Sequence, residues 1–417
     1  MREDDGPGRV AVVGAGMLGL ATAWFLQRRG VEVTVLERHH VAAGASWGNA
    51  GWLTPGLATP LPEPAVLRYG VRALLDPASP VYVPFTADRD LLRFLASFTR
   101  HSTATRWRRA MAALIPLNER ALPAFDLLAE SGAMVETREA IPLLAAYRTP
   151  PEMQGLLEEL DHLRAAGQRV EHDLLTGDQA RELAPSLSGE IGAAIRLHGQ
   201  RFVDAGAYVQ ALAAAFRLGG GTVREGVEVT EVRPRGNGVT VVGADGARET
   251  FDRVVLATGA GLGGLAREFG VRRLVLAGRG YSFSVPVDPT PTGPIYFPRH
   301  RVACTPLGDR LRVAGMMELR GPDAPLDRRR IAAIVAAVRP LLSGVDLDAR
   351  TDEWVGSRPC TPDGLPLVGV TASPQVWTAG GHGMWGITLG PVTGQLLAEA
   401  IVTGRTPPEL TPLDPLR

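Results

Sequence analysis

The stretch that decides the fold is "RVAVVGAGMLGLATAWFLQRRGVEVTVLE", residues 9–37. Its β-branched run at 9–13 predicts a buried strand, the glycine-rich residues 14–19 predict a tight turn, and residues 20–29 predict a helix. Gly30 is typical of a helix end, and residues 31–37 have the character of a second buried parallel strand. The segment is therefore predicted to form a βαβ unit.

Three glycines in the turn, Gly14, Gly16 and Gly19, have the G-x-G-x-x-G spacing. Between a strand and a helix, this spacing lets backbone N–H groups and the positive end of the helix approach a pyrophosphate. Glu37 ends the second strand about 20 residues on, where a carboxylate accepts hydrogen bonds from an adenosine ribose. Because an acid there disfavours a 2′-phosphate, the sequence predicts FAD or NAD(H) rather than NADP.

Three further stretches of small residues favour FAD over NAD(H). They are "GASWGNAGWLTP" (44–55), "VVLATGA" (254–260) and "GGHGMWG" (380–386). The first two let the backbone come close to a ligand. The third opens the last predicted helix and offers its positive end to the electron-rich pyrimidine edge of a reduced flavin, which a nicotinamide enzyme does not need.

The rest of the chain alternates helices and strands. Residues 61–110 read as a proline-rich excursion followed by a helical insertion. A helix capped by Asp204 precedes a small antiparallel meander with turns at 237–238 and 245–246. Residues 271–320 are β-rich, 329–342 predict an amphipathic helix, and 376–404 predict a strand, a glycine-rich turn and a helix. The predicted fold class is α/β with an α+β part.

Composition narrows the partners and the location. With 417 residues, of which 45% are apolar, two packed domains are expected. Lys plus Arg and Asp plus Glu both number 44, so there is no electrostatic case for nucleic acid. The two cysteines, Cys304 and Cys360, form no CxxC pair, which argues against a metal site and favours a reducing cytoplasm. The polar start, "MREDDGPGRV", has no signal-peptide character, and no run of ~20 apolar residues predicts a membrane span.

Five motifs in order along the chain carry a family resemblance. The segment at 10–38, "GASWGNAGWLTPG", "GRGYSFSV" (278–285), "WVGSRPCTPDGLPLVG" (354–369) and "AGGHGMWGITLGPVTG" together resemble the FAD-dependent D-amino acid dehydrogenases of the D-amino acid oxidase and glycine oxidase superfamily. The resemblance implies a Rossmann-like FAD-binding domain assembled from 1–75, 165–265 and 350–417. It also implies an inserted antiparallel-sheet substrate domain, with helices, from 76–164 and 266–349.

The resemblance also implies an activity and its residues. The expected reaction oxidises the Cα–N bond of an amino acid by hydride transfer to flavin N5, giving an imine and then a 2-oxo acid and ammonia. Arg358 matches the arginine that binds the substrate carboxylate, and Tyr281 is a candidate pocket hydroxyl. The matching flavin positions are Gly14, Ala15, Gly16, Leu18, Gly19, Glu37, Arg38, Ala45, Ser46, Asn49, Ala50, Gly51, Leu53, Val229, Thr258, Gly259, His382, Gly383, Met384, Trp385, Gly386, Ile387 and Thr388.

Two departures from the family qualify this transfer. Relatives that tether flavin to a histidine carry it where this chain has Gly48, and Cys360 is out of register with the cysteine used by sarcosine-oxidase-type relatives. We therefore expect non-covalent FAD. Glycine oxidases bring a second arginine to the substrate from the last turn, where this chain has Met384 and Trp385. A less polar pocket, for a hydrophobic or cyclic amino acid, is implied.

Alternatives remain for each assignment. Arg358 could serve as a surface residue or an ion-pair partner, Tyr281 as a packing residue, and His382 as a turn residue rather than a base. The basic segment at 93–109 could rest on a membrane or pack on its own protein. The substrate could instead be a secondary amine or imino acid, such as sarcosine, proline or hydroxyproline, or an amino-acid-derived metabolite. The chain could also be a flavoprotein subunit of an electron-transfer complex, and the electron acceptor could be oxygen or a quinone.

Overall fold

The computed structural model describes residues 6–64, 81–84, 88–130 and 136–417. The βαβ unit predicted from the opening stretch is confirmed: β1 is Arg9–Val13, α1 is Met17–Gln27 and β2 is Glu32–Glu37. β1 and β2 pair in parallel. The helix begins three residues earlier than predicted because the glycine turn is shorter than the motif.

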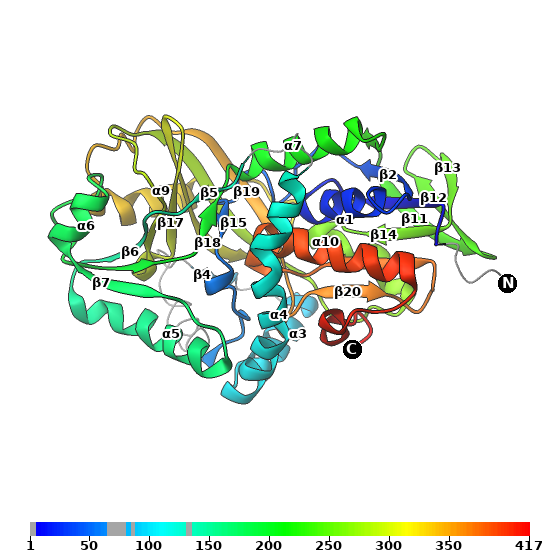
Figure 1. The fold of residues 1–417 in the computed structure, drawn as a ribbon, viewed down its shortest axis with the longest axis horizontal. Coiled ribbons are helices and arrows are strands. Elements are labelled where there is room, and N and C mark those ends of the chain that lie inside the picture. Colours follow the sequence, from blue (N-terminus) through cyan, green and yellow to red (C-terminus); the bar gives the residue numbers. More distant parts are fainter. Residues whose placement is uncertain (1–5, 65–80, 85–87, 131–135) are drawn as a thin grey trace.

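A six-stranded sheet surrounds this unit, in the order β10-β2-β1-β14-β21-β20. Its other strands are β10 (Thr222–Glu225), β14 (Arg253–Leu256), β20 (Leu367–Val370) and β21 (Val376–Gly380). All neighbours pair in parallel except β20 with β21. The strands come from the beginning, the middle and the end of the chain, so the sheet closes only when distant segments meet (Figure 1).

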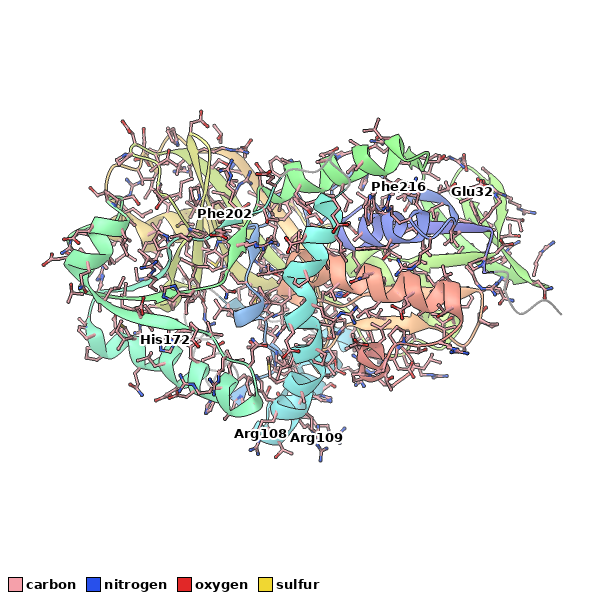
Figure 2. The ribbon with its side chains drawn as sticks, viewed as in Figure 1. Glu32, Arg108, Arg109, His172, Phe202 and Phe216 are labelled. Atoms are coloured by element: carbon pink, nitrogen blue, oxygen red, sulfur yellow. The ribbon has the colours of Figure 1, made fainter. Side chains whose placement is uncertain are left out.

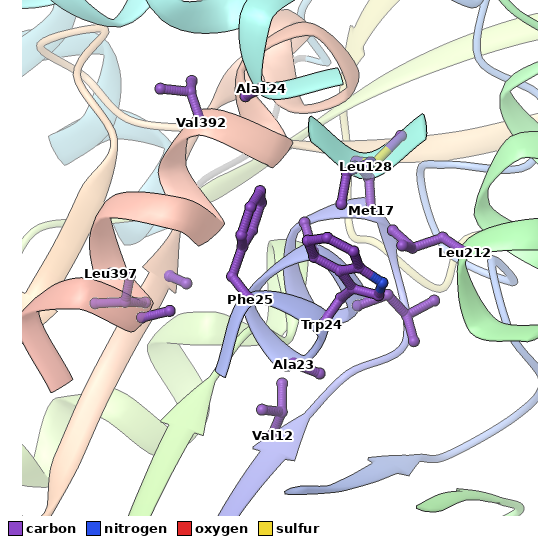
Figure 3. Close-up of a cluster of buried hydrophobic side chains, with 14 of the residues drawn as sticks. Val12, Met17, Ala23, Trp24, Phe25, Ala124, Leu128, Leu212, Val392 and Leu397 are labelled. Carbon is purple, nitrogen blue, oxygen red and sulfur yellow. The ribbon is translucent and has the colours of Figure 1, made fainter. Parts of the chain in front are cut away.

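One face of this sheet is covered by α1, α7 (Ala205–Leu218) and α10 (Gly386–Thr403). α1 is apolar on nearly all sides and buries Trp24 and Phe25, whose rings meet edge to face at 4.9 Å. Figure 3 shows these two rings between α10, which carries Leu397, and α7, which carries Leu212. Helix–sheet packing over this face forms the largest hydrophobic core and holds the glycine turn rigidly.

The opposite face is covered by the predicted meander, which is confirmed. β11 (Val229–Arg235), β12 (Gly238–Gly243) and β13 (Arg248–Phe251) pair antiparallel. Gly236 and Gly246 take positive φ in the two turns, which suits tight hairpin connections. The first turn is at 236–237, one residue earlier than predicted, because Gly238 already pairs as the first residue of β12. Phe251 and Val241 pack against Val254 of the sheet, so the meander seals a second core.

A nine-stranded sheet forms the other half of the molecule, in the order β19-β15-β18-β17-β16-β6-β8-β7, with β4 beside β18. Its strands are β4 (Val81–Tyr82), β6 (Leu143–Tyr147), β7 (His172–Thr176), β8 (Ala193–Leu197), β15 (Leu276–Pro286), β16 (Ile295–Phe297), β17 (Val302–Leu307), β18 (Arg310–Leu319) and β19 (Thr351–Cys360). The β-rich prediction for 271–320 is confirmed. The predicted amphipathic helix is also confirmed as α9 (Arg328–Val338), which packs on one face of this sheet.

The remaining elements join the two sheets. Helices α3 (Arg89–His101), α4 (Ala104–Ala129), α5 (Gln154–Ala166), α6 (Gly177–Leu183) and α8 (Leu262–Ala266) accompany a third sheet of β3 (Trp52–Leu53), β9 (Arg201–Phe202) and β5 (Arg138–Glu139). Short 3-10 turns lie at η1 (Pro55–Leu57), η2 (Pro150–Met153), η3 (Gly259–Gly261), η4 (Arg267–Phe269), η5 (Pro298–His300), η6 (Arg339–Leu341), η7 (Gly383–Trp385) and η8 (Pro408–Leu413). The proline-rich excursion predicted after residue 61 lies largely outside the described residues.

The basic helical segment packs its apolar side on the protein. Phe94 of α3 and Trp107 of α4 are buried, while Arg108 and Arg109 are exposed at the edge of the molecule (Figure 2). This arrangement is the packed amphipathic alternative raised by the sequence. Among the described helices, none is long and apolar enough to cross a bilayer.

The boundaries predicted for the FAD-binding domain and the substrate domain stay a prediction. The six-stranded sheet is drawn from three parts of the chain, as a discontinuous domain requires. However, β7 and β8 lie within 165–265 and β19 lies within 350–417, and all three pair in the nine-stranded sheet. We therefore propose that the flavin domain uses less of these two ranges than the boundaries state.

Candidate active site

Two glycines at the turn between β1 and α1 leave no room for another residue. Gly14 has φ of +112°, and a Cβ added there would lie 2.5 Å from the carbonyl oxygen of Ala257. A Cβ on Gly19 would lie 2.0 Å from the carbonyl oxygen of Gly14. At these two positions the turn therefore packs backbone against backbone, which only glycine allows.

The start of α1 is arranged for an anion. The helix has no acidic residue in its first turn, so its positive end is not neutralised from within. Ser46, from the predicted flavin segment, accepts a hydrogen bond from the backbone N–H of Met17 at 3.2 Å. The backbone oxygen of Ala15 accepts one from Ala42 at 3.0 Å. The segment around 42–46 thus frames the helix start.

Glu37 is fixed beside the same turn. Its carboxylate accepts hydrogen bonds from the backbone N–H groups of Ala15 at 2.9 Å and His39 at 3.0 Å. The backbone oxygen of Glu37 accepts a bond from Val227, which brings the start of β11 and its first residue, Val229, next to it. Arg38 is exposed and lies 3.8 Å from Asp323. Glu37 and Val227, two residues before the predicted flavin position Val229, are therefore in direct contact.

The predicted segment 45–53 lies between the two large sheets. Gly51 has φ of +75°, and a Cβ there would lie 1.9 Å from the carbonyl oxygen of Val203. The side chain of Asn49 accepts a hydrogen bond from the N–H of Gly51 at 2.9 Å. From the nine-stranded sheet, the hydroxyl of Thr305 donates to the carbonyl oxygen of Ala50 at 2.6 Å. These contacts join the segment to the nine-stranded sheet and to Val203, and Leu53 at its end is buried.

The predicted ribityl-side residues follow β14. The backbone of Ala257 packs against Gly14, and Thr258 comes directly after Ala257. The Thr258 hydroxyl is buried and has no hydrogen-bond partner among the described residues. A buried hydroxyl without a partner is costly unless a ligand or water satisfies it. Gly259 opens η3 with φ of +58°.

The last glycine-rich turn places His382 in the core. Its Nε2 lies 3.0 Å from the hydroxyl of Thr393 in α10. Burial lowers the pKa of His382 to about 4, because a charged ring would lose its water, and a backbone hydrogen bond at Gly380 offsets this in part. The ring is therefore neutral near pH 7 and suits a turn residue better than a general base.

The same turn separates its two large residues. The indole N–H of Trp385 donates to the carbonyl oxygen of Thr59 at 2.8 Å, and its ring packs against the core. Met384 is 36% exposed. The hydroxyl of Thr388, in the first turn of α10, donates to the carbonyl oxygen of Trp52 at 2.9 Å. The predicted residues 382–388 thus meet the predicted segment 45–53.

Arg358 lies close to this turn, on β19. Cys360, two residues on, forms an isolated bridge with His382, and β19 contacts both η3 and η7. Nη1 of Arg358 donates to the carbonyl oxygen of Met316 at 2.8 Å. Among the described residues, no carboxylate lies within ion-pair distance of its guanidinium. Burial lowers the pKa of Arg358, since no opposite charge compensates for the lost water.

Tyr281 faces the other way. In β15 it alternates with Gly280 and Ser282, so its side chain lies on the α9 side of the sheet, away from Arg358. Its hydroxyl donates to Glu318 at 2.5 Å, and Glu318 also pairs with the buried Arg279. Burial and this hydrogen bond raise the pKa of Tyr281 to about 12. The structure does not bring Tyr281 together with Arg358, and its catalytic role stays a prediction.

Taken together, the described residues fit FAD. A glycine turn and a helix start with no acidic residue suit the pyrophosphate. A carboxylate held by backbone N–H groups suits the ribose, and a second glycine-rich turn opens α10. Thr258 supplies a buried hydroxyl that lacks a partner. In the described part of the chain, no group of three or more His, Cys, Asp or Glu side chains could hold a metal ion.

Sequence reasoning missed two residues that lie against Arg358, Gly280 and Met317, and one that lies against Gly48, Trp354. A Cβ on Gly280 would overlap its guanidinium, the Met317 sulfur lies 3.9 Å from its Nη1, and the Trp354 ring lies against Gly48. The signal for Gly280 was present in "GRGYSFSV", because an isolated glycine inside a strand marks a close approach. Met317 and Trp354 could not be found in this way, because nothing in the neighbouring sequence distinguishes them from ordinary core residues.

Comparisons with known proteins identify the family and the fold. A family model described as FAD dependent oxidoreductase, DAO, matches residues 9–400. Solved structures of similar fold include glycine oxidase from Geobacillus kaustophilus, at 23% identity and a TM-score of 0.73, covering 98% of this chain and 99% of that one. Glycine oxidase from Bacillus cereus ATCC 14579 is 23% identical with a TM-score of 0.71, covering 97% and 96%. L-proline dehydrogenase from P. horikoshii is 19% identical with a TM-score of 0.70, covering 100% and 98%.

Proposed function

The chain belongs to the DAO family of FAD-dependent oxidoreductases, and from this premise we propose that it oxidises the Cα–N bond of an amino acid of the D configuration. When bound, FAD supplies the oxidation by taking the Cα hydrogen as a hydride at N5, and water hydrolyses the resulting imine to a 2-oxo acid and ammonia. The protein itself has to bind the amino acid and orient it.

Arg358 is the observation that carries the proposal. Three buried arginines of the described chain, Arg279, Arg312 and Arg330, each lie within 4 Å of a carboxylate. Arg358 is half-buried beside the flavin turn and has none. A guanidinium stays charged even when burial lowers its pKa, and it holds a carboxylate through two parallel hydrogen bonds. A substrate carboxylate would supply the charge that the protein omits.

The substrate side chain is proposed to be apolar or cyclic. A small cavity is lined by Leu61, Cys360, His382, Met384, Trp385 and neighbouring small residues, and none of these side chains is charged at neutral pH. Trp385 is bound to Thr59, so its ring serves as a wall. Met384, which is more exposed, is the residue that can adjust to the substrate.

The proposal is tested by anaerobic bleaching of the flavin near 450 nm with a panel of D- and L-amino acids and cyclic imino acids. We expect bleaching by apolar D-amino acids. Arg358→Ala should keep FAD but raise KM by about 100-fold or more, while the control Arg405→Ala, in the exposed chain after α10, should leave KM unchanged. Unchanged kinetics of Arg358→Ala with a D-amino acid would sink the proposal.

The same panel separates the alternatives. Bleaching only by sarcosine, proline or hydroxyproline would support a secondary-amine enzyme. Bleaching by nothing in the absence of other chains would support a subunit of an electron-transfer complex. Re-exposure to air then distinguishes an oxidase from a dehydrogenase, because only the former re-oxidises rapidly.

We also propose that the FAD is held without a covalent bond. A Cβ on Gly48 would lie 2.3 Å from the Trp354 ring, so a tethering side chain at that position has no room. Cys360 is buried, and burial raises the pKa of its thiol to about 11, which disfavours a reactive thiolate. Acid precipitation should leave the yellow colour in the supernatant, and a yellow pellet would contradict the proposal.

Both cysteines are buried and unpaired, which is compatible with the predicted cytoplasmic location.

A further inference from the structure

Two glycines of β15 lie opposite the residues around Arg358 in β19. The strands pair antiparallel, with Gly278 opposite Arg358 and Gly280 opposite Gly356. Because side chains alternate along a strand, positions 278 and 280 point to the same face of the sheet as Arg358. This face is the one that meets the flavin segment, since Ser282 on it donates to the carbonyl oxygen of Gly48.

The space above Gly280 is filled by the guanidinium of Arg358. A Cβ added at 280 would lie 2.2 Å from Nη2, 2.3 Å from Cζ and 2.6 Å from Nη1. Gly280 does not have a positive φ, so its backbone would accept any residue. The glycine is therefore required for space and not for a turn, which is unusual in the interior of a strand.

A side chain at 280 would clash with the part of the Arg358 guanidinium that is free to bind a substrate. Nη1 is committed to the carbonyl oxygen of Met316 and lies near the Met317 sulfur. Nε and Nη2 donate no hydrogen bond to any residue that the structure describes. A carboxylate bound through two parallel bonds needs such a pair of nitrogens. Nη2 is the atom nearest to the space that a side chain at 280 would take.

We propose that Gly280 is a positioning residue for the substrate: its missing side chain lets the Arg358 guanidinium lie flat on β15 with Nε and Nη2 directed at the carboxylate. This inference rests on the proposed function. Even one methyl group at 280 displaces the fork, so it weakens the binding of carboxylates and not the binding of FAD. An amine that lacks a carboxylate gains nothing from the fork and is unaffected.

The test compares holoenzymes carrying Gly280→Ala, Arg358→Ala, both substitutions, or the control Gly315→Ala. Gly315 lies in the neighbouring β18, and its added Cβ would meet Val302 at 3.2 Å on the α9 side of the sheet. The probes are acetate and benzoate, whose dissociation constants are read from the change in flavin absorbance. KM and kcat are measured in parallel for the best amino acid of the panel. FAD content and thermal unfolding are recorded for every variant.

We expect Gly280→Ala to raise the dissociation constants of acetate and benzoate at least tenfold. It should also raise KM by a larger factor than it lowers kcat. In the Arg358→Ala background, the same substitution should have no effect on the probes. If Gly280→Ala fails to fold, the double variant should fold, because the clash is with the removed side chain; failure of both overturns the proposal. Wild-type affinity in Gly280→Ala, or equal weakening by Gly315→Ala, also overturns it. Wild-type protein that binds neither carboxylate would instead refute the proposed function, and the inference with it.

Discussion

The pH dependence of stability is predicted to depend on His382. In the folded protein the pKa of His382 is about 4, mainly because the ring is buried, whereas an unfolded chain gives histidine its ordinary value of 6.5. As the pH falls, the unfolded state therefore binds the proton first. The stability that the neutral ring contributes is complete above about pH 6.5 and is lost toward pH 4. The loss amounts to about 2 kcal/mol at pH 5 and about 3 kcal/mol at pH 4.

His382→Gln isolates this effect, since a glutamine amide can still bond to Thr393 but does not titrate. Urea unfolding of the holoenzyme, followed by tryptophan fluorescence at about pH 7, 6 and 5, gives the free energy of unfolding of both proteins. Between pH 7 and 5 the wild type should lose about 2 kcal/mol more than the variant. The control His162→Gln, on the exposed side of α5, should follow the wild type. Equal losses in wild type and His382→Gln would refute a buried neutral imidazole.

Three further predictions concern other parts of the molecule. Glu318→Gln leaves a fully buried arginine without its countercharge and should lower the free energy of unfolding in urea by about 3–5 kcal/mol, whereas the exposed control Glu32→Gln should cost under about 1 kcal/mol. Gly51→Ala should lower the flavin-to-protein absorbance ratio, because its Cβ would lie 1.9 Å from a backbone oxygen. The control Gly44→Ala, whose Cβ would meet nothing within 4 Å, should leave the ratio unchanged. Equal ratios in the two variants would contradict a role of the 45–53 segment in binding FAD. Because Trp107 is buried, the protein should not co-sediment with anionic vesicles above the level seen with neutral ones; enrichment would show that the basic helices bind lipid.

The cofactor site was largely predictable because its chemistry is backbone chemistry. A turn that must bring N–H groups to a pyrophosphate needs glycine at fixed spacings, and Gly14 indeed takes the positive φ that other residues avoid. Glu37 was also predictable from local sequence, because its place at the end of β2 follows from the length of that strand. Local sequence also located the meander turns, the first of them to within one residue, and the helix that Asp204 caps.

The face on which a side chain lies was harder to predict. Tyr281 and Gly280 are adjacent, yet one packs beneath α9 with Glu318 and the other lies under Arg358. The alternation is visible in the sequence, but which face meets the flavin segment depends on pairing between β15 and β19, which are far apart in the chain. Met384 and Trp385 show the same limit, because only packing against Thr59 decides which of them becomes a wall.

The amino-acid sequence by itself therefore determined the βαβ unit, the FAD-type glycine turns and the presence of a lone arginine in the "WVGSRPC" stretch. These features follow from local steric and hydrogen-bonding requirements, which neighbouring residues express directly. Only the tertiary structure decided that no carboxylate of the described residues accompanies Arg358, that Gly280 leaves room for it, and that Cys360 brings it to the flavin turn. Those properties depend on which distant strands lie side by side, and strand register is set by the whole packed sheet.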